Sequence, residues 1–158
     1  MQQTVLCYLE RGGQYLMLYR NKKKNDPNAG KWIGVGGKPE PGETPEQALL
    51  REVAEETGLT LTAYRRRGVV DFYSDTFGSE RMHLFTATAW EGTLHPCSEG
   101  ELRWIKKTDL PNYPLWEGDA LFLHALQQEK PPFHLCLYYR GESLVSHTWE
   151  PLPQNPAW

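Results

Sequence analysis

The sequence contains no long apolar run, and this absence excludes a membrane-spanning helix, which needs about 20 consecutive apolar residues. Its apolar stretches are short, as in residues 15–19. The first residues also lack the basic region, apolar core and cleavage site of a secretion signal. With 158 residues, 39% of them hydrophobic, the chain has the size and composition of one globular domain. We expect one domain over residues 1–150, an irregular tail over residues 151–158, and a cytoplasmic location.

Cysteine is scarce, with Cys7, Cys97 and Cys136 as the three examples. Their odd number and wide spacing fit neither a disulfide framework nor a metal knuckle. We therefore expect reduced thiols.

The chain also lacks an excess of positive charge, because its net charge is −3 at pH 7. A protein that binds polymeric nucleic acid normally needs a basic face, so we expect neither nucleic acid nor a membrane as partner. A small anion held locally remains possible, and the oligomeric state is left open. The basic run Lys22–Lys24 near Arg20 is either a solvated loop or a rim that attracts phosphate.

The first third of the chain predicts a β-hairpin followed by a long loop. Residues 4–9 and 14–20 favour strands, and Arg11–Gly13 between them favours a turn. From Asn21 to Gly37 the composition shifts to Lys, Asn, Pro and Gly, interrupted by Trp32 and Ile33. Such a loop is typical of a functional site.

Residues 43–57 then predict a helix with well-defined ends. Thr44 is the expected N-cap, Pro45 the first helical residue, and Gln47 completes a capping box. Gly58 is placed to end the helix as its C-cap.

The remainder predicts two further hairpins, a short strand and a second helix. The expected elements are strands over residues 68–73 and 82–90 around a turn at 74–81, a strand over 101–105, a helix over 117–128, and strands over 133–139 and 143–149 turning at 140–142. One side of the second helix is expected to be buried: Ala120, Leu121, Leu123, His124 and Leu126.

Three glutamates gather on one face of the first predicted helix. Glu52, Glu55 and Glu56 stand at i, i+3 and i+4, which brings their carboxylates close together. Such a face is either a solvated surface or a cation site. A divalent cation would relieve the repulsion, and oxygen ligands favour Mg²⁺, with Mn²⁺ as an alternative. Because Mg²⁺ commonly joins carboxylates to phosphates, the implied partner is a polyphosphate.

The loop before this helix adds to the prediction. Its glycines allow backbone groups to approach a metal or a phosphate: Gly34, Gly36, Gly37 and Gly42. Lys38 could contact a phosphate oxygen, as could the backbone of Gly37. Arg51 lies one turn before Glu55 and beside Glu52, where it can orient the carboxylates by ion pairing.

The segment GKPEPGETPEQALLREVAEETGL, residues 37–59, fills every fixed position of the pattern G-x5-E-x7-R-E-U-x-E-E-x-G-U, in which U is aliphatic. The matching residues are Gly37, Glu43, Arg51, Glu52, Val53, Glu55, Glu56, Gly58 and Leu59. In this pattern the chain resembles the Nudix hydrolase family. The resemblance implies an α/β/α sandwich with a mixed β-sheet, in which a loop and helix hold the metal ions.

By the same resemblance, Glu52, Glu55 and Glu56 match the catalytic metal ligands, together with the backbone carbonyl of Gly36. Glu43 and Arg51 are assigned to orienting them. A further acid from a later loop often completes such sites. Glu99 and Glu101 are the candidates, and Glu101 is preferred.

The expected chemistry is hydrolysis of a nucleoside triphosphate to the monophosphate and pyrophosphate. Two or more Mg²⁺ ions would neutralise the phosphate oxygens and activate a water molecule. Glu52 and Glu56 are alternative acceptors of its proton.

Outside the pattern, the chain resembles the MutT-like 8-oxo-dGTP diphosphatases of the same family. The resemblance includes GKWIGVGGK, LWEGDALF and FHLCLYYRGESL, at residues 30–38, 115–122 and 133–144. It implies that Trp116 stacks on a purine and that Asp119 accepts from its N–H edge. The alternatives are core packing for Trp116 and a favourable helix-dipole charge for Asp119.

Two further positions match residues that line the pocket in relatives: Thr4 beside the base and Arg20 near the phosphates. Phe72 and Met82 are either pocket residues of the same kind or core residues of their strands. Ile33 is a departure, because it occupies a place where animal 8-oxo-purine enzymes have a purine-binding asparagine. Asn25 and Asn28 in the preceding loop could supply the missing contact.

The leading hypothesis is therefore an enzyme that removes 8-oxo-dGTP or a related modified purine nucleotide. The alternatives are hydrolysis of a nucleotide sugar, a dinucleotide polyphosphate or another triphosphate, and a module that senses a nucleotide without cleaving it.

Overall fold

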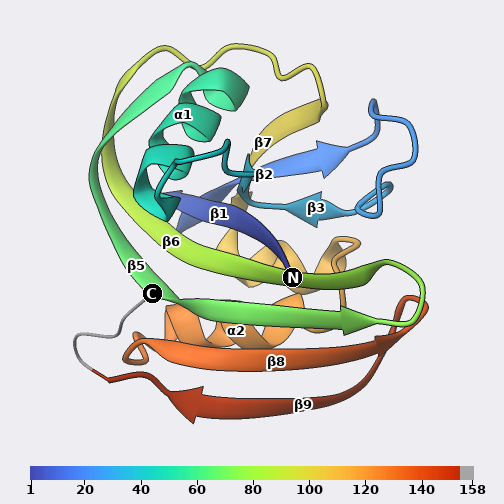
Figure 1. Cartoon of the computed structure of the whole chain (residues 1–158). Helices are drawn as coiled ribbons and strands as arrows, with labels where there is room; N and C mark the ends of the chain where they lie inside the picture. The colour runs from blue at the N-terminus through green and yellow to red at the C-terminus, as the bar shows by residue number, and fades with distance from the viewer. Residues whose placement is uncertain (154–158) are drawn as a thin grey trace.

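The computed structural model describes residues 1–153, in which strands joined edge to edge make one strongly bent β-sheet (Figure 1). The strands of this part of the chain are β1 (Gln2–Arg11), β2 (Gln14–Arg20), β3 (Trp32–Ile33), β4 (Val35–Gly37), β5 (Leu59–Ser74), β6 (Gly78–Gly92), β7 (Gly100–Lys106), β8 (Phe133–Arg140) and β9 (Ser143–Pro151). The helices are α1 (Pro45–Thr57), the 3-10 turn η1 (Lys107–Asn112) and α2 (Asp119–Gln127).

The sheet is mixed, as expected. Its main order is β3-β2-β1-β6-β5-β8-β9, with β4 added to β1 and β7 added to β2. Strand β1 runs parallel to β6, and β5 runs parallel to β8, whereas the other paired strands are antiparallel. The three hairpins and the strand after residue 100 were predicted correctly in their existence and order.

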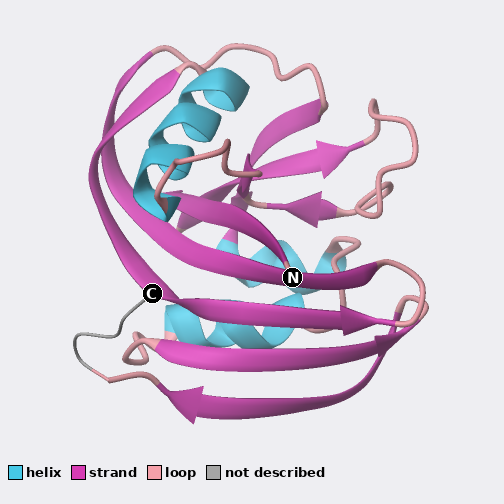
Figure 2. Ribbon diagram, in the orientation of Figure 1, coloured by secondary structure: helices cyan, strands magenta, loops and turns pink. Residues whose placement is uncertain are grey.

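Two apolar clusters fill the spaces between the sheet and the helices, which lie on opposite faces (Figure 2). On one face, Leu49 and Val53 of α1 pack against Phe85 of β6. On the other, Phe122 and Leu126 of α2 belong to the second cluster, which includes strand residues of β1, β5 and β8. These layers give the α/β/α architecture that the resemblance implied.

Helix α1 begins and ends where its sequence predicts. Thr44 is the N-cap, and its hydroxyl accepts a hydrogen bond from the Gln47 amide at 3.2 Å while the Gln47 side chain accepts from the Thr44 amide at 2.9 Å. Gly58 caps the other end in the left-handed region, with φ of 80°. Because these signals are local, they set the ends of the helix independently of its tertiary contacts.

Several boundaries and one buried face were predicted wrongly. Strands β5 and β6 extend through the predicted turn at 74–81, which is reduced to three residues, 75–77. In α2 the predicted face included Ala120 and His124, but both are exposed, and Phe122 and Ala125 are buried in their place. Strand β9 continues to Pro151, so the predicted tail begins later, and its residues 154–158 lie outside the described part.

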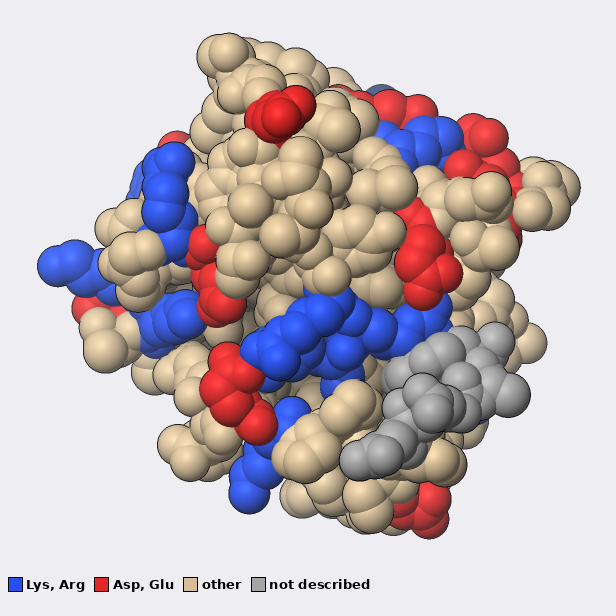
Figure 3. Space-filling model, turned by 90° about the vertical axis from the view of Figure 1, so that its left-hand side faces the viewer, with Lys and Arg blue, Asp and Glu red and all other residues tan. Residues whose placement is uncertain are grey.

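Figure 3 views the molecule from the side on which β5 and β6 bend around α1, and it shows basic side chains bordered by acidic ones. In this part of β5, Arg66 pairs with Glu46 at 2.9 Å, and Arg65 pairs with Glu129. Within residues 1–153, no helix is long and apolar enough to cross a membrane. The three cysteines are free thiols, of which Cys7 and Cys97 are buried.

Candidate active site

The glutamates of α1 face the short strand β4, which lies beside β1. The Gly36 amide donates a hydrogen bond of 2.7 Å to Oε1 of Glu56. The other oxygen of Glu56, Oε2, is buried, and no donor of the described residues reaches it. Glu52 is half-buried and Glu55 is exposed. The predicted cluster therefore forms, with Glu56 at its buried end.

Burial raises the pKa of Glu56 to about 9, and the nearby carboxyls of Glu99 and Glu52 add to the rise. Burial also raises the pKa of Glu52, although the contact with Arg51 opposes it. A site with crowded carboxyls and a buried oxygen without a donor is one in which a cation would replace protons.

The additional acid that reaches this cluster is Glu99, so the structure does not support the preference for Glu101. Glu99 lies just before β7 and contacts Glu56, and it shares a cavity with Glu52. Glu101 stands within β7 and is exposed, with Arg103 as its ion-pair partner at 3.0 Å. The two acids differ because the pleat of β7 directs Glu101 away from the cluster.

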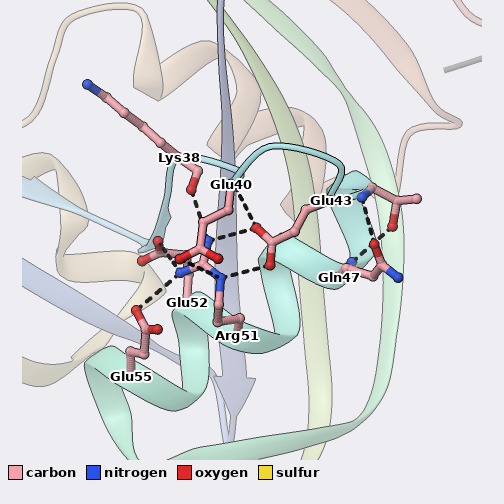
Figure 4. A network of polar contacts seen from close by, with 8 residues as sticks. Lys38, Glu40, Glu43, Gln47, Arg51, Glu52 and Glu55 are labelled. Carbon is pink, nitrogen blue, oxygen red and sulfur yellow. Dashed lines mark hydrogen bonds and ion pairs between the residues drawn. The ribbon is translucent and has the colours of Figure 1, made fainter.

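The guanidinium group of Arg51 holds the neighbouring carboxylates in place by donating several hydrogen bonds (Figure 4). Its guanidinium contacts both oxygens of Glu43 at 2.8 Å, Glu52 at 2.9 Å, Glu55 at 3.2 Å and the Lys38 carbonyl at 3.0 Å. These bonds to Arg51 lower the pKa of Glu43 to about 2. The orienting role predicted for Arg51 and Glu43 therefore agrees with the geometry, and Figure 4 shows the Lys38 side chain pointing away from the network.

Two glycines allow the loop to lie against its neighbours. A Cβ atom on Gly36 would stand 1.9 Å from the Val5 carbonyl oxygen, and one on Gly37 would stand 2.5 Å from the Glu52 carboxyl carbon. Any larger residue would push β4 away from β1 or displace Glu52. The glycines are thus required by the close approach of the chain to itself.

A cavity of about 600 Å³ connects this cluster with an aromatic region. Its walls include most of the residues predicted for substrate or metal binding: Thr4, Arg20, Asn25, Asn28, Gly36, Gly37, Lys38, Glu52, Phe72, Met82, Trp116 and Asp119. Ile33, the departure from the relatives, lines it as well. The sequence analysis missed three of its polar groups, on Glu80, Tyr139 and Gly141. The size suits a nucleotide, since ligand sites commonly measure about 300–1,000 Å³.

Asp119 is buried in the wall of this cavity, with only 3% of its surface exposed. Its Oδ1 atom is buried, and it has no hydrogen-bond partner within the described residues. Burial raises the pKa of Asp119 to about 8, and the charge of Glu80 contributes to the rise. Glu80 itself lies beside the Thr4 hydroxyl, and burial raises its pKa. Buried polar groups without hydrogen-bond partners and with shifted pKa values are typical of ligand-binding sites.

The raised pKa of Asp119 predicts how stability depends on pH. The ordinary pKa is 3.8 and the folded value is about 8, so the folded protein binds more protons between these values. Stability should therefore fall as pH rises through this window. We expect Asp119→Asn to remove part of that fall, on the order of a few kcal/mol. Urea unfolding of both metal-free proteins at pH 5 and pH 8 measures the difference, and parallel losses would contradict the prediction.

Trp116 is half-buried, and a hydrogen bond from its indole nitrogen fixes the side chain. Its indole Nε1 donates to Oδ1 of Asn28 at 2.9 Å, and the Lys31 ammonium lies 4.5 Å from the ring centroid. The rings of Tyr139 and Phe77 meet it edge to face at 5.3 and 5.9 Å. Asn28, suggested as a base contact, thus serves Trp116 here. The ring is fixed in orientation and also lines the cavity.

Arg20 is committed to carboxylates, with Asp26 at 2.7 Å and Glu99 at 3.1 Å. If Arg20 also bound a phosphate, as the sequence predicts, it would have to do so while still paired with these two carboxylates. In the present arrangement Arg20 positions Glu99.

Tyr139 of β8 completes the wall from the far end of the chain. Its hydroxyl accepts a hydrogen bond of 2.7 Å from the Gly118 amide, directly before α2. The closing hairpin is therefore tied to the segment that carries Trp116 and Asp119.

The NUDIX domain family matches residues 1–126 of the chain. An oxidized purine nucleoside triphosphate hydrolase from Danio rerio is 36% identical over 128 residues, covering 79% of this chain and 81% of that protein. A CTP pyrophosphohydrolase from Escherichia coli is 31% identical over 126 residues, covering 79% and 90%. The crystal structure of a MutT protein from Bacillus halodurans superposes with a TM-score of 0.84 at 26% identity, covering 97% of this chain and 100% of that one.

Proposed function

Because the chain belongs to the NUDIX domain family of hydrolases, we propose that it is a Mg²⁺-dependent nucleoside triphosphate pyrophosphohydrolase acting on 8-oxo-dGTP or a related modified purine nucleotide. Its products would be the nucleoside monophosphate and pyrophosphate. One observation carries the proposal: a single cavity is lined both by Glu52 and Glu99 and by Trp116 and Asp119. Phosphates and a base of one molecule can thus reach both groups.

The residues at the acidic end fit a hard divalent cation. Glu52, Glu56 and Glu99 offer carboxylate oxygens, and one buried oxygen of Glu56 has no donor among the described residues. Neither cysteine nor histidine is needed, which favours Mg²⁺ over zinc. When bound, Mg²⁺ would neutralise phosphate charge and make water a better nucleophile. Glu55 is exposed and could join as a ligand from the rim.

Side chains of the protein itself would then have separate roles in the reaction. Glu52 lines the cavity and contacts Arg51, which favours its ionised form, so it is placed to accept the proton of the attacking water. Glu56 is buried beneath it and suits a ligand better than a base. Lys38 lines the same cavity from an exposed position, where its ammonium can bind a phosphate oxygen.

The other end of the cavity, which is lined by Trp116 and Asp119, has groups that suit a base. An oxidised guanine carries an additional N–H donor at position 7, and carboxyl groups are good acceptors for it. Asp119 with its raised pKa can both accept and donate, and Glu80 lies near it. The fixed Trp116 ring offers a stacking surface. The similarity to an oxidized purine nucleoside triphosphate hydrolase supports this reading.

The similarity to a CTP pyrophosphohydrolase favours a second candidate, the same reaction on a cytidine nucleotide. Stacking on Trp116 accepts any base, so discrimination must come from the carboxyl groups.

An activity panel tests the proposal. We expect kcat/KM for 8-oxo-dGTP to exceed that for dGTP and CTP by at least about tenfold, measured as pyrophosphate release with Mg²⁺, with ADP-ribose as a further substrate. Asp119→Asn should reduce this preference, whereas Asp109→Asn, an exposed aspartate of η1, should leave it unchanged. Comparable turnover of CTP or dGTP, or better turnover of ADP-ribose, would contradict the specificity but leave the hydrolase.

A further inference from the structure

A second cluster of chemically active side chains lies on the other face of the sheet from the α2 cluster, where β5, β6 and β8 meet. Asp71 is 1% exposed, and its Oδ2 atom lies 2.7 Å from Nε2 of His134. The Sγ atom of Cys136 lies 3.6 Å from the same Nε2 atom. One donor atom from each residue falls within 4.8 Å of the other two.

This arrangement does not suit a nucleophilic triad. In such a triad the imidazole uses one nitrogen for the acid and the other for the nucleophile. Here Nε2 of His134 faces both Asp71 and Cys136. A nitrogen, a sulfur and an oxygen that lie within 4.8 Å of one another instead suit the ligand set of a metal ion.

We propose that Asp71, His134 and Cys136 bind a Zn²⁺ ion. Imidazole, thiolate and carboxylate together favour zinc over Mg²⁺, and a fourth position would be left for water. In a tetrahedral zinc site, neighbouring donor atoms stand about 3.3–3.6 Å apart. The sulfur–nitrogen distance already agrees, whereas the nitrogen–oxygen pair would open as the ion replaces the proton between them.

Arg81 of β6 supports the carboxylate. Its Nε and Nη2 atoms donate to the two oxygens of Asp71 at 2.8 and 2.9 Å. Although burial opposes the effect, Arg81 and His134 keep the pKa of Asp71 below its ordinary value, so the ligand is ionised at neutral pH. Hydrogen-bonded carboxylates of this kind are common around metal ligands. The positive charge of Arg81 would weaken the binding without preventing it.

The site would connect two strands behind the nucleotide cavity. Asp71 is followed by Phe72, which lines that cavity from the opposite face of β5, and Arg81 is followed by Met82, which also lines it. Zinc would thus join β5 to β8 at the level of the base pocket. It would be separate from the carboxylates of α1, so the inference stands whichever nucleotide is hydrolysed.

Protection of the thiol tests the proposal. Cys7 and Cys97 are buried while Cys136 is half-buried, so iodoacetamide added to the native protein should modify Cys136. With excess Mg²⁺ present to occupy the acidic cluster, one equivalent of Zn²⁺ should slow this modification by at least about tenfold. A chelator should restore the rate. An unchanged rate would overturn the proposal.

A second readout uses Co²⁺ in place of Zn²⁺, because a cobalt–thiolate bond gives an absorption band in the near ultraviolet. The band should appear in the wild type and disappear in Cys136→Ser and in His134→Gln. Glutamine can still donate to Asp71, so His134→Gln is expected to fold, which its thermal unfolding checks. His147→Gln on the exposed strand β9 is the matched control and should keep the band. A band retained in both ligand variants, or absent from the wild type, would overturn the assignment.

Discussion

Replacing Glu56 by glutamine is expected to reduce Mg²⁺-dependent pyrophosphate release by about a thousandfold or more. Glutamine has nearly the same shape, and its oxygen can still accept from the Gly36 amide, which lies 2.7 Å from Glu56. It lacks the negative charge, however, and would turn an amide toward a cation. The loss should therefore reflect the chemistry and not the fold. Steady-state assays over a range of Mg²⁺ concentrations measure it.

Two comparisons distinguish the role of Glu56 from that of its neighbour. Glu56→Gln should raise the Mg²⁺ concentration needed for activity, whereas Glu52→Gln should lower kcat even at saturating Mg²⁺. Glu46→Gln, in the first turn of the same helix, serves as control. Since burial raises the pKa of the Glu56 carboxyl and so favours its neutral form without metal, the metal-free variant should be about as stable as the wild type. Retention of half the activity would contradict the assignment.

Gly36→Ala is expected to lower the free energy of unfolding by roughly 3 kcal/mol or more. The new Cβ would stand 1.9 Å from the Val5 carbonyl oxygen, and backbone cannot move aside as a flexible side chain can. Strand β4 would have to separate from β1, with which Gly36 pairs at Leu6. Glu56 would then lose its amide donor, so activity should fall together with stability. Urea unfolding with and without Mg²⁺ measures both effects.

Gly12→Ala is the matched control for this substitution. Gly12 has a φ of 57°, and a Cβ there would meet nothing within 4 Å. We expect a loss of about 1–2 kcal/mol from the left-handed backbone alone and normal activity. If Gly36→Ala proved no more harmful than Gly12→Ala, β1 and β4 would not be as close as described.

Structural features that depend on residues close together in the sequence were predictable. Features that depend on residues far apart in the sequence were less predictable. Helix α1 is bounded by Thr44, Pro45 and Gly58, which act within one turn of the chain. The carboxylate cluster follows from that helix, because spacing alone places Glu52 and Glu56 on one face. The sequence therefore predicted that these glutamates lie together, while their role as metal ligands stays a prediction.

The choice between Glu99 and Glu101 required knowledge of where β7 begins. Strand β7 starts at Gly100, which packs so closely against β2 that a Cβ there would stand 1.8 Å from the Tyr19 carbonyl oxygen. Glu99 is thereby held at the end of the strand, and Arg20 of β2 fixes it there. No local pattern carries this information.

The longest strands also escaped prediction at their ends. In β5 the pairing with β6 is irregular between Leu61 and Ala63 and between Arg66 and Gly68, and such bulges interrupt the alternation on which a strand prediction rests. Glu80 was assigned to a turn because the residues around it, 74–81, are mostly polar. As a residue of β6 it is directed toward the cavity instead.

The hydrogen bond between Tyr139 and Gly118 has a consequence for how substrate preference can change. The family match ends at residue 126, whereas Tyr139 and Gly141 in the cavity wall come after it. Glu52 of α1 and Tyr139 of the last hairpin thus come from separate stretches of chain that line the same cavity. If the proposed function is correct, exchange of residues 133–151 between relatives is expected to alter which bases are bound while the carboxylates of α1 stay in place, so that selectivity could evolve independently of catalysis.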